Sequence, residues 1–237
     1  MAEPSHSDQR SLLKHTTTRY KPWSIPRSSV LSSYTSGTLF SLTKHPKDHR
    51  IRTMSTAERR DHIGLLQVYT GDGKGKTTAA LGLSLRALGA GLRVAFLQLF
   101  KGALPSSELA LVCRFGSDFW LKRFARELTP YSLGRGEPTD EDRQVAAEAW
   151  ATAREVILSG AWDLVVLDEV NNLLHAALIP IPDCLASLLQ RPRYVDVVCT
   201  GRGAPQQLLD VADLVTEMRC LKHPFASGVP ARPGIDC

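Results

Sequence analysis

The chain has 237 residues, of which 43% are hydrophobic and 22% charged. This composition is typical of a globular protein and excludes wholesale disorder, and no stretch approaches the ~18 consecutive apolar residues of a membrane helix. The net charge of +5 is uneven, because residues 1–53 hold nine Lys/Arg and three Asp/Glu and the rest carries −1. A nucleic-acid partner is therefore not expected. The five cysteines are scattered without a CxxC pair, which fits neither a disulfide framework nor a zinc site.

Residues 1–53 are rich in Ser and Thr and show no apolar spacing that could bury a face, so we expect a disordered leader. A basic, acid-poor, Ser-rich leader is typical of an organellar transit peptide. Met54 is an alternative start, which makes the preceding residues an extension or a start-site error. A binding arm is a third interpretation. We expect a cytoplasmic protein, or one of an organellar matrix if the leader is a transit peptide.

From residue 64, short apolar runs alternate with amphipathic stretches, a pattern that predicts βαβ units around a mostly parallel sheet. The clearest helix is expected from Asp140 to Ser159, because Thr139 can cap its start and Gly160 can end it. Its apolar stripe, with Trp150 beside it, indicates core packing. Strands are expected at 64–69, 93–99, 163–168, 194–199 and, more weakly, 213–217.

Between the first expected strand and a helix to about Leu88, the chain reads TGDGKGKTT from Thr70 to Thr78. This is the context of a P-loop, in which glycines let successive amides face phosphate oxygens at a helix N-terminus. Lys76 would bridge the outer phosphates and Thr77 would bind Mg²⁺. The strict pattern has Gly in place of Thr70, so a turn that merely joins strand to helix is the alternative. The candidate ATP-binding residues here are Gly71, Asp72, Gly73, Lys74, Gly75, Lys76, Thr77 and Thr78.

A second motif ends the strand expected at 163–168, where Asp168 and Glu169 follow four apolar residues. Ligands bind at this carboxyl edge in parallel sheets, and hard carboxylate oxygens suit Mg²⁺ or Mn²⁺. Thr77, Asp168 and Glu169 are therefore the candidate metal ligands. The alternative is a strand that ends in solvated acids. Glu169 is also placed where an ATPase would orient its attacking water, so the two motifs alone specify a metal–ATP site and not its reaction.

Further blocks follow in order along the chain: QLFKG at 98–102 with Glu108, LDE at 167–169, TGRGAP at 200–205, ADLVTEM at 212–218 and KHPF at 222–225. Together with the loop, these blocks make residues 64–237 resemble the P-loop type of ATP:corrinoid adenosyltransferase. The resemblance implies a three-layer, P-loop NTPase-like α/β domain over about residues 57–237. It also suggests a homodimer with a flavoprotein reductant as partner.

The activity that the resemblance implies is transfer of the 5′-deoxyadenosyl group of ATP to the cobalt(I) of a corrinoid, either cobalamin or cobyrinic acid a,c-diamide, with release of triphosphate. A metal nucleophile needs no general base, so the protein has to position the substrates and stabilise the leaving group. The expected catalytic residues are Lys76, Thr77 and Glu169. Arg202 could reach phosphates from the same edge or pair with a surface acid, and we favour a site role for Lys101 and Glu108.

Two departures from the resembled family stand out. Its members often carry a Phe-x-Trp pair before the long helix, where this chain reads YSLGRG at 131–136; Tyr131 or Trp120 could substitute. Its N-terminal helix over ATP is indicated here only by residues 57–62. Two rival functions stay open: an ATPase or small-molecule kinase on the same core, and a non-enzymatic, nucleotide-dependent binding module that recruits a partner through the basic leader.

Overall fold

The computed structural model describes residues 54–101, 107–108, 115–124, 136–232 and 234–235. All of them belong to one compact unit, residues 49–237. The leader expected at 1–53 lies outside the described residues, as does Tyr131. No helix in the described part of the chain is long and apolar enough to cross a membrane.

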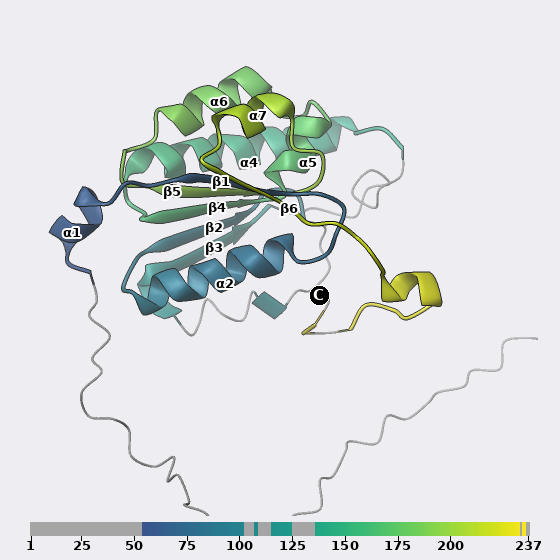
Figure 1. Ribbon diagram of the computed structural model, residues 1–237. Helices are drawn as coiled ribbons and strands as arrows, with labels where there is room; N and C mark the ends of the chain where they lie inside the picture. Colours follow the sequence, from purple (N-terminus) through teal and green to yellow (C-terminus); the bar gives the residue numbers. More distant parts are fainter. Residues whose placement is uncertain (1–53, 102–106, 109–114, 125–135, 233, 236–237) are drawn as a thin grey trace, which may run out of the picture. The chain divides into compact units, whose positions relative to one another are not determined.

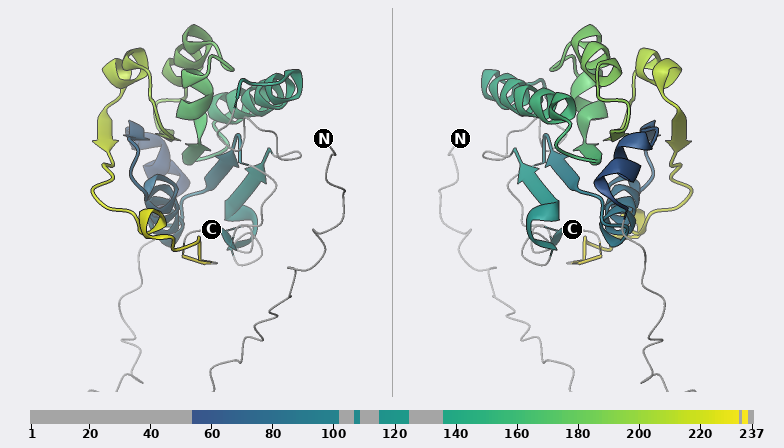
Figure 2. Two further views of the ribbon diagram at one scale, coloured as in Figure 1. Left: turned by 90° about the vertical axis from the view of Figure 1, so that its right-hand side faces the viewer. Right: turned by 90° about the vertical axis from the view of Figure 1, so that its left-hand side faces the viewer.

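Six parallel strands of the described ranges form the central sheet, in the order β3-β2-β4-β5-β1-β6. Figure 2 shows β6 and β3 at opposite edges of this sheet. The α/β fold class with a parallel sheet is confirmed, and five strands lie within a few residues of their predicted positions. Their bounds are β1 Leu66–Thr70, β2 Val94–Gln98, β3 Phe119–Arg123, β4 Leu164–Asp168, β5 Asp196–Thr200 and β6 Leu214–Glu217.

The strand β3 was not among the predicted ones. Its sequence, FWLKR, has two cations in five residues and lacks the apolar run of a central strand. As an edge strand it pairs only with β2, so it needs less apolar surface than β4, which is buried on both sides. The sheet therefore continues one strand beyond the predicted set, on the side away from β1 and β6.

Helices cover both faces of the sheet and make three layers (Figure 1). The helix α2, Lys76–Gly89, covers one face, and the other face carries α4, α5, α6 and α7. The predicted helix is confirmed as α4, Asp140–Ser159, with Thr139 and Asp142 in a capping box and Gly160 left-handed at its end. The other helices of the described residues are α1 Thr56–Asp61, α5 Val170–His175, α6 Ile181–Leu189 and α7 Gln206–Val211, with 3₁₀ turns η2 Gly116–Asp118 and η3 Pro224–Ser227.

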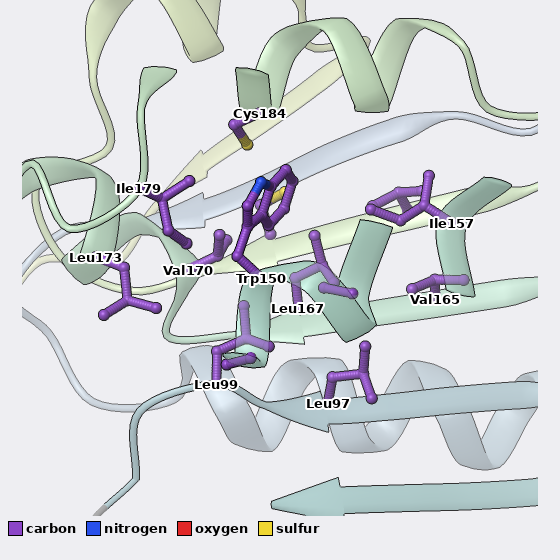
Figure 3. Packing of buried hydrophobic residues seen from close by; sticks show 14 of the residues in the cluster. Leu97, Leu99, Trp150, Ile157, Val165, Leu167, Val170, Leu173, Ile179 and Cys184 are labelled. Carbon is purple, nitrogen blue, oxygen red and sulfur yellow. The ribbon is translucent and has the colours of Figure 1, made fainter. Parts of the chain in front are cut away.

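The larger part of the core lies between the sheet and the α4–α7 layer. Figure 3 shows the Trp150 ring between Cys184 of α6 and Leu167 of β4. The indole nitrogen of Trp150 donates a hydrogen bond to Asp183, so its one polar atom is satisfied in the core. The predicted packing role of the α4 stripe is thus confirmed, and the rigid layer behind β4 holds the end of that strand in place.

The N-terminal helix α1 lies near the amino ends of the strands. Arg59 contacts Asp163, which precedes β4, and His62 contacts Asp196 at the start of β5, at 3.2 and 2.9 Å. No residue of α1 is buried. In this structure α1 is therefore attached at the sheet edge opposite the carboxyl ends, and it does not fold over the loop between β1 and α2.

Candidate functional site at the carboxyl edge

The glycines of the loop between β1 and α2 are required by two separate constraints. Gly71 and Gly75 have φ angles of +91° and +121°, which side-chain-bearing residues rarely adopt. A Cβ atom on Gly71 or Gly73 would also lie 2.5 or 2.6 Å from the carbonyl oxygen of Met218, just after β6. The Gly73 amide donates to that same oxygen at 2.6 Å. The loop thus follows the backbone of a neighbouring segment closely.

Lys76, the first residue of α2, turns its ammonium into the curl of this loop. Its Nζ donates to the carbonyl oxygens of Gly71 and Gly73, at 2.5 and 2.7 Å. Burial lowers the pKa of Lys76, and the nearby Arg202 guanidinium lowers it further, while Asp72 and the acids at 168–169 oppose this. An anion inside the loop would therefore find a partly desolvated cation and a helix N-terminus at one point.

Asp168 ends β4, and its side chain is fully buried. Its Oδ1 accepts hydrogen bonds from the hydroxyls of Thr77 and Thr200, at 2.9 and 2.6 Å. Its Oδ2 is buried and has no hydrogen-bond partner among the described residues. Burial raises the pKa of Asp168, against the opposing hydrogen bond from Thr200. A buried carboxylate oxygen of this kind is costly unless it meets a cation or a donor.

Glu169 has left-handed backbone, with φ of 69°, at the start of α5. Its amide donates to the Thr200 hydroxyl at 3.0 Å, which holds the strained turn in place. Burial, and then the charge of Asp168, raise the pKa of Glu169 to about 7. Strained backbone and a raised pKa at the end of one strand are both frequent at functional sites.

Arg202 follows β5 and stands beside the loop. Its amide donates to the Asn172 side chain at 2.6 Å, and its guanidinium Nε lies 3.9 Å from Asp72. Both side chains are mostly exposed, so this ion pair contributes little energy by itself. Of the two interpretations of Arg202, its pairing with a surface acid is observed, and its position at the loop leaves phosphate contact available.

The side chains of the remaining loop residues do not face the inside of the loop in the way that Lys76 does. Lys74 donates to the carbonyl oxygen of Ile235 at 3.0 Å, so its ammonium faces the C-terminal segment. Asp72 and Thr78 are exposed. The structure thus brings Gly71, Gly73, Lys76, Thr77 and the two acids together, while Lys74 is directed elsewhere.

Two residues at this edge were given no role from the sequence: Gln98, which ends β2 and was quoted only as part of the QLFKG block, and Arg123, which ends β3. Gln98 is fully buried and donates to the Glu108 carboxylate at 2.7 Å, and Arg123 donates to the Gln98 carbonyl at 2.7 Å. Lys101 also donates to Glu108 at 2.7 Å. A polar residue at the end of an apolar strand was the available signal for Gln98, whereas Arg123 belonged to the unpredicted strand.

The electrostatics of Glu108 follow from these contacts. Burial by itself would raise the pKa of Glu108, but hydrogen bonds from Lys101, a backbone amide and Gln98 lower it to about 2. The carboxylate is therefore ionised throughout the neutral range and cannot serve as a base there.

Trp120, considered as a substitute for the missing aromatic pair, is the second residue of β3 and stacks on Trp162 with ring centroids 5.8 Å apart. Trp162 precedes β4, so this pair lies toward the amino ends of the strands. Trp120 is thus placed away from the carboxyl edge, and that hypothesis is not supported for it.

A glycine-lined loop that leads a strand into a helix, with a lysine inside it and an acid at the end of a second strand, defines a P-loop nucleotide-binding protein. The family model of ATP:corrinoid adenosyltransferase BtuR/CobO/CobP matches residues 62–237, and the chain belongs to this family of transferases.

Several relatives carry the name corrinoid adenosyltransferase. That of Pseudomonas aeruginosa is 38% identical over 185 residues, which covers 76% of this chain and 87% of the relative. That of Escherichia coli K12 is 36% identical over 180 residues, covering 76% and 89%. That of a Sinorhizobium species is 37% identical over 199 residues, covering 81% and 89%. Among solved structures, the flagellar accessory protein FlaH of Methanocaldococcus jannaschii has a TM-score of 0.43 and 14% identity, covering 66% of this chain and 71% of FlaH.

Proposed function

We propose that this chain transfers the 5′-deoxyadenosyl group of ATP to the cobalt(I) of a corrinoid and releases inorganic triphosphate. Membership of the adenosyltransferase family supports this proposal. The observation that carries it is the Lys76 ammonium, held within the loop beside the Thr77–Asp168 contact. These groups form an anion site at the point where a triphosphate tail would lie.

A divalent cation, Mg²⁺ or Mn²⁺, fits the residues next to this anion site. The buried Oδ2 of Asp168 has no partner in the part of the chain that the structure describes, and the Thr77 hydroxyl donates to the other oxygen of the same carboxylate. Among the described residues no group of three or more His, Cys, Asp or Glu is arranged to hold a metal. Mg²⁺ needs none, because it takes one or two carboxylates together with phosphates and waters. Asp168, Thr77 and Glu169 would hold it, and it would neutralise phosphate charge.

The proposed reaction assigns binding and charge stabilisation to this chain. The cobalt–carbon bond forms with an electron pair from cobalt(I), and the bond from C5′ to oxygen breaks with its pair on the triphosphate. The negative charge therefore develops on an oxygen of the leaving group. Lys76 and the loop amides would donate to that group, and Arg202 stands beside the loop to contact it. Stabilisation of the negative charge on the leaving group is therefore the contribution of this chain to the rate.

A second candidate function is phosphoryl transfer or ATP hydrolysis, and the environment of Glu169 favours it. A carboxylate with its pKa raised to about 7 is suited to accept a proton from water or from a hydroxyl group. Glu169→Gln would then be far more damaging than in adenosyl transfer, where no proton has to be removed. The third alternative, recruitment of a partner through residues 1–53, depends on residues outside the described ones.

Further features extend this proposal by analogy with the family. Residues 57–237 form the catalytic domain, which acts as a homodimer and receives electrons for cobalt(I) from a flavoprotein. The enzyme works in the cytoplasm, or in an organellar matrix if residues 1–53 are a transit peptide. Mass spectrometry of the mature N-terminus decides between these locations.

The decisive experiment mixes the purified full chain with ATP, Mg²⁺ and a chemically reduced corrinoid. We expect a light-sensitive adenosylated corrinoid and triphosphate in equal amounts. Orthophosphate without adenosylation overturns the proposal and favours the second candidate. Competition between cobalamin and cobyrinic acid a,c-diamide identifies the preferred corrinoid.

The role of the loop is tested with Lys76→Ala, which removes the ammonium that faces the anion site. We expect turnover to fall by about 100-fold or more. Lys122→Ala is the matched control, because it removes an equal charge away from the loop. The Lys122 ammonium lies over the Phe124 ring, 4.5 Å from its centre. Full activity of Lys76→Ala would remove the loop from the mechanism.

A further inference from the structure

The backbone around Arg202 is held by side chains from two other segments of the carboxyl edge. The Arg202 amide donates to Oδ1 of Asn172, on α5, at 2.6 Å. Two residues later, the Ala204 amide donates to the hydroxyl of Thr70, the last residue of β1, at 3.3 Å. The turn after β5 is therefore attached both to the helix that follows the acids of β4 and to the strand that enters the glycine loop.

Asn171 joins the ends of β1 and β5 directly. Its side-chain nitrogen donates to the carbonyl oxygens of Tyr69 and Gly201, at 3.3 and 3.2 Å, and these two acceptors fix the orientation of the amide. The side chain is fully buried, and its Oδ1 has no hydrogen-bond partner among the described residues. A buried acceptor without a donor costs stability, so the link between the two strand ends is kept at a cost.

The same turn packs tightly against α5. Gly201 and Gly203 have φ angles of +129° and +62°, which favour glycine. A Cβ atom on Gly201 would lie 2.7 Å from Oδ1 of Asn172. One on Gly203 would lie 2.8 Å from Nδ1 of His175, at the end of α5. The backbone of Arg202 is thus restrained on both sides, by close packing as well as by hydrogen bonds.

The side chain of Arg202 is exposed although its backbone is restrained. It is 69% exposed, and its ion pair with the exposed Asp72, at 3.9 Å, adds little stability. Burial lowers the pKa of Lys76 and the charge of Arg202 lowers it further, so the guanidinium lies within electrostatic reach of the lysine in the loop. A solvated surface arginine does not require such a rigid base, whereas a group that has to meet a ligand in one position does.

We propose that Thr70 and Asn172 are positioning residues, which hold the turn of Arg202 so that its guanidinium contacts phosphate oxygens of the nucleotide bound in the loop. This inference rests on the proposed nucleotide site. Thr70 stands where the strict P-loop pattern has Gly, and a glycine has no hydroxyl to accept from Ala204. The departure from the pattern therefore has a role: it joins the phosphate-binding loop to the turn that carries a second cation.

The test is a double-mutant cycle on the full chain, with calorimetric binding of inorganic triphosphate in the presence of Mg²⁺ as its readout. We expect Arg202→Met to weaken triphosphate binding about tenfold or more, because it removes a charged donor. Thr70→Val and Asn172→Ala should each weaken it about threefold or more. Combined with Arg202→Met, neither should weaken binding further, because their effect passes through the guanidinium. Thr70→Ser keeps the hydroxyl and should bind triphosphate as the unmodified chain does.

Thr216→Val is the matched control, because Thr216 is exposed on β6, in register with Tyr69 of the neighbouring strand and outside the turn. It should leave triphosphate binding unchanged. Additive effects of Thr70→Val and Arg202→Met would show that Thr70 acts on the loop or on stability, and would overturn its positioning role. Unchanged binding in Arg202→Met would overturn the contact with phosphate.

Should Thr70→Val fail to fold, Asn172→Ala and Arg202→Met form the same cycle. Failure of the unmodified chain to bind triphosphate would overturn the proposed nucleotide site and this inference with it, whereas binding with additive effects would overturn this inference alone. Because binding is measured without turnover, a chain that shows the expected coupling but transfers no adenosyl group would contradict the proposed function and support the inference.

Discussion

The strand β4 has a buried aspartate at each end, and the two differ in one respect. Asp163, before the strand, is 5% exposed, and its Oδ2 accepts from the Arg93 amide at 2.7 Å and from Arg59 at 3.2 Å. Asp168, at the other end, is fully buried, and no described residue donates a hydrogen bond to its Oδ2. Burial of an acid is therefore common to both edges of the sheet. Satisfaction of its oxygens separates the structural aspartate from the candidate functional one.

The residues around the two ends of β4 show the same difference as the two aspartates. Near the amino ends of β3 and β4, the Trp120 and Trp162 rings line an open cavity of about 480 Å³ whose walls are mainly apolar. At the carboxyl edge stand a strained glutamate, a lysine within a glycine loop and a row of directed hydrogen bonds. At the amino edge the Asp163 carboxylate is paired with groups of the chain itself, whereas at the carboxyl edge the Asp168 carboxylate has an oxygen with no partner among the described residues.

The largest effect is expected from Asp168→Asn. Turnover should fall by about 100-fold or more, because the neutral amide no longer supplies charge to a divalent cation. The free energy of unfolding should change by less than about 1 kcal/mol, since the variant also removes an unsatisfied buried charge. Enzyme assays with a Mg²⁺ titration and urea unfolding measure the two quantities. A large loss of stability with unchanged turnover per folded molecule would instead make Asp168 a structural residue.

The opposite result is expected from Asp163→Asn. It weakens the hydrogen bonds from the Arg93 amide and from Arg59, so the free energy of unfolding should fall by about 1–3 kcal/mol. Turnover per folded molecule should remain within about twofold of the unmodified chain. Urea unfolding, with activity normalised to the folded fraction, tests this prediction, and a large loss of turnover in a stable variant would contradict it.

The pH dependence of stability sharpens the same contrast through Glu169. Its pKa is about 7 in the folded chain and 4.5 as an ordinary value, so between these pH values the folded chain binds more protons than the unfolded one. The free energy of unfolding should therefore fall as pH rises from 4.5 through 7, by on the order of 2 kcal/mol without Mg²⁺. Glu169→Gln should reduce this slope to the part that Asp168 contributes, since the pKa of Asp168 is also raised, and Glu155→Gln on α4 should leave the slope unchanged. An unchanged slope in Glu169→Gln would assign it to another group.

The smallest effect is expected from Trp162→Phe at the amino edge. It reduces the stacking contact with Trp120, so we expect a loss of about 1 kcal/mol in the free energy of unfolding. Adenosyl transfer should stay within about twofold, because the ring lies away from the carboxyl edge. Thermal unfolding measures the change in stability, and the enzyme assay measures adenosyl transfer. A selective loss of turnover would connect the two edges.

The features that sequence reasoning predicted well are those with a local cause. The helix α4 carries its own cap, its stop signal and its apolar stripe within one segment. Likewise, the acids of β4 follow an uninterrupted apolar run. The missed strand β3 has no such local signal, because its stability comes from pairing with β2. The contact of Arg123 with Gln98 joins residues of two strands and depends on their register, which no single segment encodes.

The closeness of Met218 to the glycine loop has a consequence for biogenesis. Gly71 and Gly73 lie against the backbone of Met218, which the ribosome adds only after all six described strands have been made. A nascent chain that stops before Met218 lacks the backbone against which the loop between β1 and α2 packs. We expect such a chain to bind ATP weakly. Tight binding of ATP therefore indicates that synthesis has passed the last described strand. The substrate thus distinguishes a completed chain from a truncated one.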